Sequence, residues 1–229
     1  DVAVDPPRAG GRTGGRGRAR GRGRGTPTQP PGPPPVEVGC SQLNLHRSHR
    51  ARDNLDLHPS KIQILQEPPL IRGSREHALS REGYVVYAAP PRGREGPRAA
   101  LRISKTIASS ALLDHMDRDR VVAVVRVGRD EVVIVSQYCD SNMQTIAPGL
   151  QRVVDYCRDR RMPLILGADS NAHSTTWGPT QNQRGDEFDA FISQNNLLVL
   201  NDGLKPTYHH WVNNSLTETY IDITLVNIF

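Results

Sequence analysis

The stretch Met162-Pro163-Leu164-Ile165-Leu166-Gly167-Ala168-Asp169-Ser170-Asn171-Ala172-His173 begins as a short apolar run and ends in turn formers and polar residues. An apolar run of this length, bounded by turn formers, is typical of a buried β-strand. In a strand, Asp169 and Asn171 lie two positions apart and point to the same face. Such a pair suits the activation of a water molecule next to a phosphate, because Asp accepts a proton and Asn holds an oxygen. The pattern is equally typical of a turn with capping side chains, so other segments must decide.

The length and the apolar content of the chain limit the classes of protein to which it can belong. Its 229 residues are enough for one large domain or two small ones. No apolar run approaches the roughly 18 residues of a membrane-spanning helix. The Arg-rich N-terminal region lacks the apolar segment of a secretory signal. The first residue is Asp rather than Met, so we expect a fragment or a trimmed product.

The net charge of +5 is concentrated in residues 1–35, where seven arginines face only Asp1 and Asp5. This segment is rich in Gly and Pro and can bury almost nothing, so we expect a disordered arm, followed by a folded domain over residues 36–229. Two interpretations of the arm stay open: a soluble linker, or an arm that binds DNA or RNA through phosphates and base stacking. The arginines that would do so are Arg12, Arg16, Arg18, Arg20, Arg22 and Arg24.

The three cysteines, Cys40, Cys139 and Cys157, are an odd number and form no C-x-x-C pair. Neither a zinc site nor a disulfide framework is indicated. We therefore expect a reducing, intracellular compartment. Cys157 falls on the apolar face of a predicted helix and is expected in the core.

Apolar periodicity predicts an alternation of strands and helices along the folded part. The two runs 121–127 and 131–138 flank Gly128-Arg129-Asp130, which is typical of a hairpin. Leu150, Val153, Val154 and Cys157 have the spacing of an amphipathic helix. A second helix is predicted around residues 186–195, and a helix or irregular connection over 46–60. The other predicted strands cover residues 36–45, 62–67, 84–88, 99–103, 164–166, 197–200, 207–208 and 221–225.

Several oxygen-bearing side chains fall at the ends of predicted strands or inside them. They are Asn44, Glu67, Tyr138, Asp169 with Asn171, and Asp222. Asp222 interrupts an otherwise apolar strand, and a buried carboxylate needs a partner such as an imidazole or a metal ion. The hydroxyl of Tyr138 could reach a phosphate. Each position alone has an ordinary structural explanation, whereas the ordered series suggests one shared site.

This ordered series resembles the endonuclease/exonuclease/phosphatase superfamily, and most closely the endonucleases of jockey- and R1-type non-LTR retrotransposons. The resemblance covers residue 36 to the C-terminus. The segments that carry it include Gln42-Leu43-Asn44, Leu65-Gln66-Glu67-Pro68, Ser136-Gln137-Tyr138, Gly167-Ala168-Asp169-Ser170-Asn171-Ala172-His173 and Ile221-Asp222-Ile223-Thr224. Shorter matches are Trp177-Gly178, Arg184-Gly185, Asn201-Asp202-Gly203 and Pro206-Thr207-Tyr208.

The resemblance implies a four-layered α/β sandwich, with two facing mixed sheets flanked by helices. It also implies an enzyme that cleaves phosphodiesters with Mg²⁺ or Mn²⁺, whose substrate is DNA and which nicks a target for reverse transcription. By position, Glu67 would be the metal ligand, with Asn44 close to the metal and the phosphate. Asp169 would orient or deprotonate the attacking water. The positions of Asn171, Tyr138 and His173 would contact phosphate or DNA.

The family also carries a final strand with Ser-Asp-His, which this sequence lacks before it stops at Phe229. In the family, the residue equivalent to Asp222 orients that His. We therefore expect a C-terminally truncated domain that has lost its last strand, has an unpaired sheet edge, and is a poor or inactive nuclease. The sequence leaves open whether a reverse transcriptase domain follows in the native gene.

Two alternatives to this function come from different classes. A cellular abasic-site nuclease or a phosphatase would use the same fold, but the Asn171-Ala172-His173 run with Trp177-Gly178 argues against both. A non-catalytic protein that binds nucleic acid through its Arg/Gly arm is the other alternative. Removal of residues 1–35 separates the classes, because an enzyme keeps its cleavage activity and a binding module loses its ligand.

Overall fold

The computed structural model describes residues 37–57, 60–69, 78–90, 95–143, 146, 148–212 and 214–227. Residues 35–229 form one compact unit. The Arg/Gly arm predicted over residues 1–35 lies outside the described residues, and so does the predicted start of the first strand at Val36. None of the helices in the described part of the chain has the length and apolar character that a membrane span requires.

The first sheet contains four strands in the order β1-β2-β4-β3. Its strands are β1 (Cys40–Asn44), β2 (Ile62–Gln66), β3 (Tyr84–Ala88) and β4 (Ala99–Ser104). β1 pairs with β2 in parallel, and β4 is antiparallel to both β2 and β3. The sheet is therefore mixed, with β1 at one edge within the described residues.

The second sheet contains six strands in the order β5-β6-β7-β8-β12-β9. Its strands are β5 (Ser109–Ala111), β6 (Arg120–Val127), β7 (Asp130–Tyr138), β8 (Leu164–Asp169), β9 (Leu198–Val199) and β12 (Asp222–Asn227). β7 and β8 are parallel, and the other pairs are antiparallel. The predicted hairpin at Gly128 is confirmed, and this glycine has a φ of 64°.

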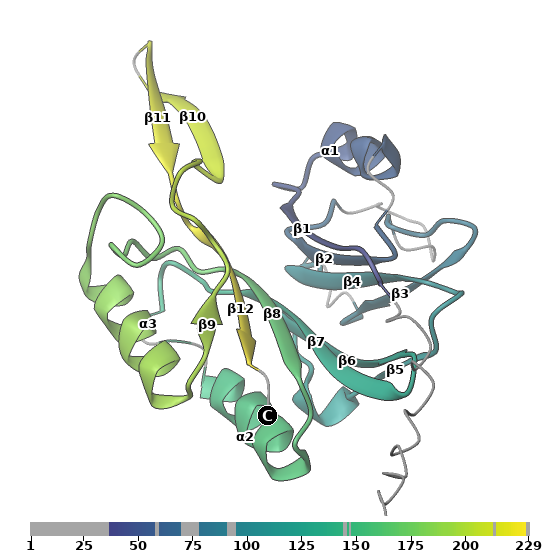
Figure 1. Cartoon of the computed structure of the whole chain (residues 1–229). Coiled ribbons are helices and arrows are strands. Elements are labelled where there is room, and N and C mark those ends of the chain that lie inside the picture. The colour runs from purple at the N-terminus through teal and green to yellow at the C-terminus, as the bar shows by residue number, and fades with distance from the viewer. Residues whose placement is uncertain are drawn as a thin grey trace, which may run out of the picture. The chain divides into compact units, whose positions relative to one another are not determined.

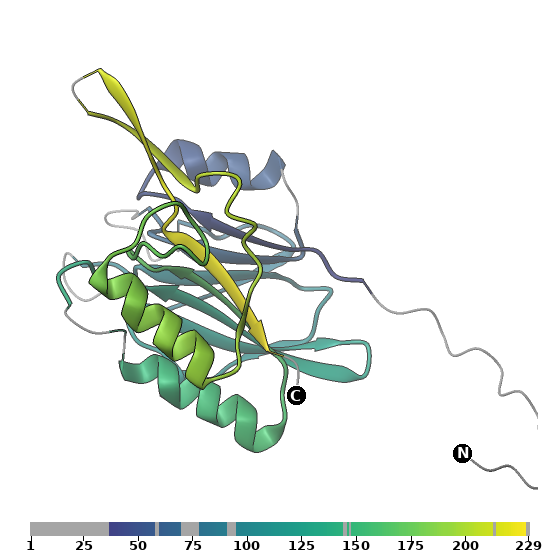
Figure 2. The ribbon, with the colours of Figure 1, turned by 60° about the vertical axis from the view of Figure 1, so that its left-hand side comes forward.

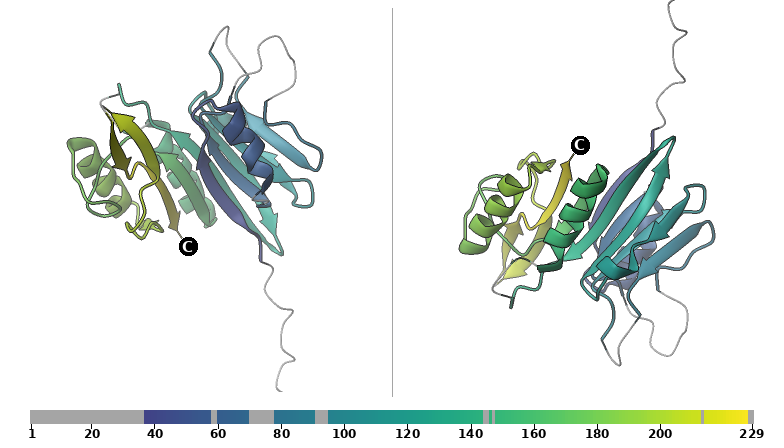
Figure 3. Two further views of the ribbon diagram at one scale, coloured as in Figure 1. Left: turned by 90° about the horizontal axis from the view of Figure 1, so that it is seen from above. Right: turned by 90° about the horizontal axis from the view of Figure 1, so that it is seen from below.

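The two sheets face one another and carry helices on their outer sides (Figure 1 and Figure 3). The helices are α1 (His49–Asn54), α2 (Pro148–Arg160) and α3 (Gln183–Gln194), with short 3₁₀ turns at Leu55–Leu57 and Leu113–His115. Ile64 and Ile103 pack against Val121 and Ile134 between the sheets. The four-layered α/β sandwich expected from the sequence is therefore confirmed.

Apolar side chains of the two long helices cover the outer face of the six-stranded sheet. Leu150, Val153, Val154 and Cys157 of α2, with Phe188 of α3, pack in the same cluster as the outward-facing residues of β7, β8 and β12. Cys157 is fully buried, as predicted. On the other side, Leu55 and Ala51 cover Leu65 of the four-stranded sheet.

The apolar pattern did not predict β5, nor the second strand of a hairpin that lies apart from both sheets. β10 (Tyr208–Val212) and β11 (Ser215–Thr219) pair only with one another and extend away from the sheets (Figure 2). β11 reads Ser-Leu-Thr-Glu-Thr and lacks an apolar face, and β5 has only three residues. Neither strand is buried enough for periodicity to reveal it.

Candidate active site

Strand ends from both sheets meet at one edge of the sandwich. Asn44 ends β1, Tyr138 ends β7, Asp169 ends β8, Asp222 begins β12, and Glu67 follows β2 directly. Asp169 is the register partner of Tyr138 on one side and of Asp222 on the other. Asp222 lies at the end of β12 nearest to the β10–β11 hairpin (Figure 1). The topology therefore collects residues that are up to 178 positions apart in the sequence.

Hydrogen bonds between polar side chains and the facing sheet join the two sheets at this edge. Asn44 Nδ2 donates to Asp169 Oδ2 at 2.7 Å, and Gln42 Nε2 donates to the carbonyl of Ala168 at 3.1 Å. Gln66 Nε2 donates to the carbonyl of Gly167 at 3.1 Å. A Cβ on Gly167 would lie 2.6 Å from Gln42 Oε1. Glycine at this position therefore permits the close approach that brings Asn44 to Asp169.

Glu67 is held in an uncommon backbone conformation, with a φ of 45°. Its N–H donates to the carbonyl of Arg98 at 2.8 Å. Its carboxylate lies 3.4 Å from His46 Nδ1 and 3.7 Å from Arg47 Nε. The hydrogen bond and charge of His46, with the charge of Arg47, keep the pKa of Glu67 below its usual value. Glu67 is therefore ionised at neutral pH and available to a cation, and a hydrogen bond from Asn44 further favours its charged form.

Asp169 is the most deeply buried carboxylate of the site, with 2% of its surface exposed. Burial raises its pKa to about 7, and the negative charges of Asp222 and Glu67 act in the same direction. The N–H of Asn171 donates to Asp169 Oδ1 at 3.3 Å and opposes this shift. A carboxylate with a pKa near neutrality can accept and release a proton at physiological pH.

Asp222 is positioned by two residues of the short motifs seen in the sequence. Thr207 Oγ1 accepts from the N–H of Ile221 and of Asp222, each at 3.1 Å, and Asn201 Nδ2 donates to the carbonyl of Asp222 at 3.0 Å. Burial raises the pKa of Asp222 to about 6. Its Oδ1 is buried and has no hydrogen-bond partner among the described residues. Asp222 thus presents an unsatisfied acceptor at the site.

Tyr138 is flanked by a cation that the sequence did not single out. The guanidinium of Arg98 lies 4.6 Å from the centre of the Tyr138 ring. The same guanidinium binds Asp119 through two hydrogen bonds of 2.5 Å and Asp140 through one of 2.6 Å. Burial raises the pKa of Tyr138, and the charges of Glu67 and Asp169 raise it further. The phenol therefore stays protonated and can donate a hydrogen bond.

Asn171 lies at the site, but not as the sequence predicted. β8 ends at Asp169, and Asn171 has a φ of 47°, so the prediction that both side chains point to one face of a strand is wrong. The chain turns at Ser170, whose N–H and hydroxyl both donate to the carbonyl of Ile221. The side-chain amide of Asn171 donates to the carbonyl of Cys139 at 2.9 Å. Asparagine tolerates this left-handed conformation better than most residues.

His173 is half-buried in the loop that leads to α3. Its N–H donates to Asn182 Oδ1 at 3.1 Å, and its Nδ1 lies 3.3 Å from Thr180 Oγ1. The hydrogen bonds of its side chain and N–H therefore connect it to the N-terminal end of α3.

Among the described residues, His46 is the histidine that contacts the acidic cluster. The sequence did not indicate it, because its position two residues after Asn44 was the only available signal.

The donor set of the site fits a hard divalent cation. The charge of Glu67 raises the pKa of both Asp169 and Asp222, so the three carboxylates interact through space, and Asn44 adds a carboxamide. Oxygen ligands of this kind, with retained waters, are those that Mg²⁺ prefers. Within the described ranges, no three His, Cys, Asp or Glu side chains form a ready-made metal cage. Glu67 and Asn44 would thus hold the ion, with water molecules completing its coordination.

The raised carboxylate pKa values predict a pH-dependent stability of the metal-free protein. Between pH 4 and 7 the folded state keeps protons that the unfolded carboxyls have released, so the free energy of unfolding falls as pH rises. Asp169, with a pKa of about 7, and Asp222, with a pKa of about 6, both act in this direction, as does His46, whose pKa is raised chiefly by its hydrogen bond with Glu67. The lowered pKa of Glu67 has the opposite effect: it stabilises the folded state, and this contribution is lost only in more acidic solution.

Differential scanning calorimetry in EDTA checks this expectation. We expect the Tm to be lower at pH 8 than at pH 5 by several degrees, since each pKa unit corresponds to about 1.4 kcal/mol. Asp169→Asn should flatten the pH profile, whereas Asp155→Asn, on the exposed side of α2, should leave it unchanged. An identical pH slope in Asp169→Asn and the unmodified protein would show that Asp169 does not titrate in this range.

Comparison with known proteins supports the assignment suggested by this geometry. Residues 132–228 match a family model described as endonuclease-reverse transcriptase. The endonuclease domain of TRAS1, a telomere-specific non-LTR retrotransposon, superposes with a TM-score of 0.67 and 24% identity, covering 80% of this chain and 82% of that chain. No curated protein sequence matches the chain significantly.

More distant solved structures share the same fold. TDP2 from D. rerio, complexed with a single-strand DNA product, has a TM-score of 0.53 and 11% identity, and covers 83% of this chain and 84% of that chain. The 3′ phosphatase NExo from Neisseria, bound to a product DNA hairpin, has a TM-score of 0.53 and 16% identity over 83% and 86% of the two chains. The described domain therefore shares the fold of these structures, and residues 132–228 resemble a family of endonuclease-reverse transcriptases.

Proposed function

We propose that this protein is a Mg²⁺- or Mn²⁺-dependent endonuclease that nicks DNA as part of a non-LTR retrotransposon protein. The observation that carries the proposal is the hydrogen bond of 2.7 Å that joins Asn44 of one sheet to Asp169 of the other. This bond supports the proposal because it brings Asn44, which lies close to Glu67, next to Asp169, the proposed base. A pair of unrelated turns would not produce such a contact between strand ends 125 residues apart.

The chain's own residues would divide the reaction among them. Asp169 orients the attacking water and accepts its proton, which its pKa of about 7 permits at neutral pH. Tyr138 and Asn171 bind phosphate oxygens, and Glu67 with Asn44 holds the cation. When bound, a divalent cation neutralises the negative charge that develops on the phosphate and on the leaving oxygen. Asp222, with its unsatisfied buried oxygen, positions a neighbouring donor.

The finer parts of the proposal concern the substrate and the cellular role. DNA is the proposed substrate, because the TDP2 and NExo structures with this fold contain DNA. We also propose that the protein acts in the nucleus, next to a reverse transcriptase, since the description of the matched family names a reverse transcriptase. The Arg/Gly arm of residues 1–35 would add nucleic-acid affinity without sequence preference. The low activity expected from the missing Ser-Asp-His motif also stays a prediction.

A plasmid-nicking assay tests the proposal. With the protein in excess, supercoiled DNA should be converted to nicked circles in Mg²⁺ or Mn²⁺, and EDTA should stop the conversion. Glu67→Gln should lower the rate by about 10² or more, because it removes one charged ligand of the cation. Glu82→Gln, a change of the same kind at an exposed position, is the matched control. Equal nicking in EDTA, or by Glu67→Gln, would overturn the metal-dependent mechanism.

A further inference from the structure

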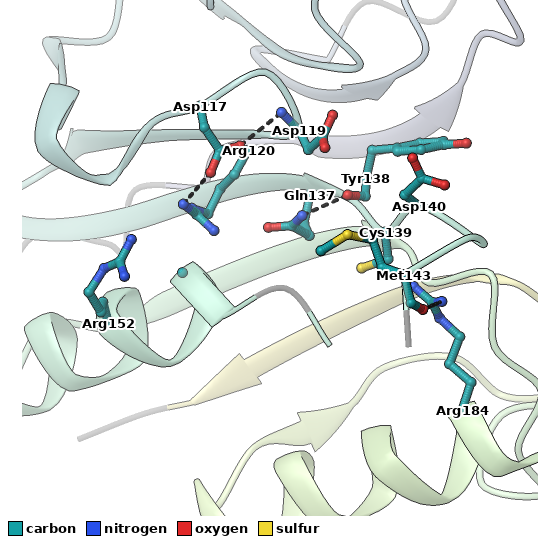
Figure 4. A pocket seen from close by; sticks show the side chains of 11 residues that line it. Asp117, Asp119, Arg120, Gln137, Tyr138, Cys139, Asp140, Met143, Arg152 and Arg184 are labelled. Carbon is teal, nitrogen blue, oxygen red and sulfur yellow. Dashed lines mark hydrogen bonds and ion pairs between the residues drawn. The ribbon is translucent and has the colours of Figure 1, made fainter. Parts of the chain in front are cut away.

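A recess of about 270 Å³ lies next to Tyr138, between the end of β7 and the first turns of α2 and α3 (Figure 4). Tyr138 belongs both to this recess and to the acidic cluster of the active site. None of the roles assigned above uses the rest of the recess. The charged and amide side chains that line it are Asp117, Asp119, Arg120, Gln137, Asp140, Arg152 and Arg184.

The acidic groups of the recess are already paired. Asp117 accepts a hydrogen bond of 2.5 Å from Arg120. Asp119 and Asp140 both bind Arg98, which lies behind Tyr138. The charge of Arg98 and the hydrogen bonds it donates keep the pKa of Asp140 near 2. These carboxylates therefore do not repel an anion as free carboxylates would.

The basic groups of the recess are not fully paired. Arg152, in the second turn of α2, has no ion-pair partner in the described part of the chain. Arg184 donates from Nε to the carbonyl of Ser170 and from Nη1 to the carbonyl of Met143, and its Nη2 is buried without a hydrogen-bond partner among the described residues. Counted with Arg98, which pairs with Asp119 and Asp140, the recess and its border hold four arginines and three aspartates, so the excess positive charge is one.

The start of α2 adds to this positive potential. The guanidinium of Arg120 lies over the first turn of the helix, where a Cβ on Gly149 would be 2.2 Å from Nη1 and Nη2. Only 3% of the surface of Arg120 is exposed. The first N–H groups of a helix are unpaired within the helix and carry partial positive charge. Asp117 offsets the charge of the buried Arg120 here, and the first turn of this 13-residue helix contains no acidic residue of its own.

Gln137 adds a second, independent requirement. Its side chain is fully buried, its Nε2 donates to the carbonyl of Tyr138 at 2.7 Å, and its Oε1 has no partner among the described residues. A buried acceptor without a donor costs about 1–3 kcal/mol. A phosphodiester group has no N–H or O–H donor, so it cannot satisfy this acceptor. A nucleotide can, because it carries an anionic phosphate together with N–H or O–H donors.

We propose that this recess is a second nucleotide-binding subsite, which holds the nucleotide next to the cleaved linkage. Arg152, next to Arg120, faces its phosphate, and Gln137 accepts a hydrogen bond from its base or sugar. Tyr138 separates this subsite from the acidic cluster and so fixes the position of one relative to the other. This inference rests on the proposed function, because the ligand is taken to be the nucleic-acid substrate.

Binding of a fluorescein-labelled DNA duplex, measured by anisotropy in EDTA over a series of salt concentrations, tests the subsite without cleavage. Arg152→Gln should weaken binding about 5- to 10-fold and reduce the slope of log K against log[salt] by about 0.9, the loss of one phosphate contact. Arg129→Gln, in the turn at the far end of the β6–β7 hairpin, removes the same charge and should change the slope little. Both positions are exposed, so neither change disturbs the core.

A second measurement tests whether the side-chain oxygen of Gln137 accepts a hydrogen bond from the ligand. Deoxyadenosine 5′-monophosphate and inorganic phosphate are titrated separately, and the side-chain amide signal of Gln137 is followed by NMR. The nucleotide should shift this signal, and Gln137→Leu should weaken nucleotide binding several-fold without changing phosphate binding. Circular dichroism checks that Gln137→Leu is folded. If Gln137→Leu is not folded, Gln151→Leu on α2 is a second variant for comparison.

Each outcome decides the proposal. If Arg152→Gln and Arg129→Gln change the salt slope equally, or if DNA does not bind the unmodified protein, the subsite is refuted. If phosphate and nucleotide shift the Gln137 signal equally, the recess is a simple anion site and the nucleotide assignment is wrong. If the slope changes as expected but no variant or condition gives Mg²⁺-dependent nicking, the subsite stands and the proposed nuclease activity fails.

Discussion

Asp169→Asn should reduce the nicking rate about 10³-fold while the protein stays folded. The amide cannot accept the proton of the attacking water, and loss of a general base costs about 10² to 10⁴ in rate. The amide oxygen of the new Asn can still accept the hydrogen bond that Asn44 donates at 2.7 Å. Single-turnover nicking in Mg²⁺ measures the rate, and thermal unfolding measures the fold.

The stability of this variant separates catalysis from structure. Asp169 is buried, and the nearby charges of Asp222 and Glu67 oppose its ionisation. At pH 8 and without metal, the neutral Asn should therefore keep or raise the Tm. Asp155→Asn changes an exposed ion pair with Arg158 on α2 and should alter neither activity nor stability. A variant that nicks DNA at more than a tenth of the unmodified rate would exclude Asp169 as the base.

Gly185→Ala should destabilise the protein by about 3 kcal/mol or more, because the new Cβ has no space. It would lie 1.8 Å from the carbonyl oxygen of His173 and 2.6 Å from the carbonyl carbon, and both are backbone atoms. Asn182 is the N-cap residue of α3, and its Oδ1 accepts a hydrogen bond of 2.8 Å from the N–H of Gly185. Urea denaturation should show the loss, and the Tm should fall by about 6–12 °C.

Gly39→Ala is the matched control for this prediction, since nothing lies within 4 Å of a Cβ at that position. It should change the free energy of unfolding by less than about 1 kcal/mol. The clash at Gly185 should also reduce nicking, because the adjacent Arg184 donates from Nε to the carbonyl of Ser170, directly after Asp169. Unchanged stability in Gly185→Ala would mean that the loop of residues 173–182 can move away freely.

The sequence predicted the site well where a motif coincides with the end of a buried strand. Tyr138 follows a long apolar run and Asp169 a shorter one, so both strands could be located from the apolar pattern alone. The resemblance to a family then supplied the order of the strands, which no local pattern contains. The four layers and the meeting of Asn44, Glu67 and Asp169 were expected on that basis.

The parts that the sequence did not reveal depend on contacts between distant segments. Arg98 lies in a Pro- and Gly-rich region, and only the fold shows that it stacks on Tyr138 and binds Asp119. His46 became relevant only when β1 and β2 paired and brought Glu67 to it. The strand prediction failed at Asn171, where a residue that tolerates a left-handed backbone ends the strand two positions early.

The polar contacts between the sheets have a consequence for how this protein loses activity. Gln66 and Ser136 are fully buried and bond to the facing sheet, while the apolar layer around them is non-directional. Apolar packing tolerates a small sliding of one sheet over the other, but hydrogen bonds of 2.7–3.2 Å do not. Catalytic activity therefore depends on the alignment of the two sheets. Mild heat or denaturant that lets one sheet slide over the other would abolish activity before the protein unfolds.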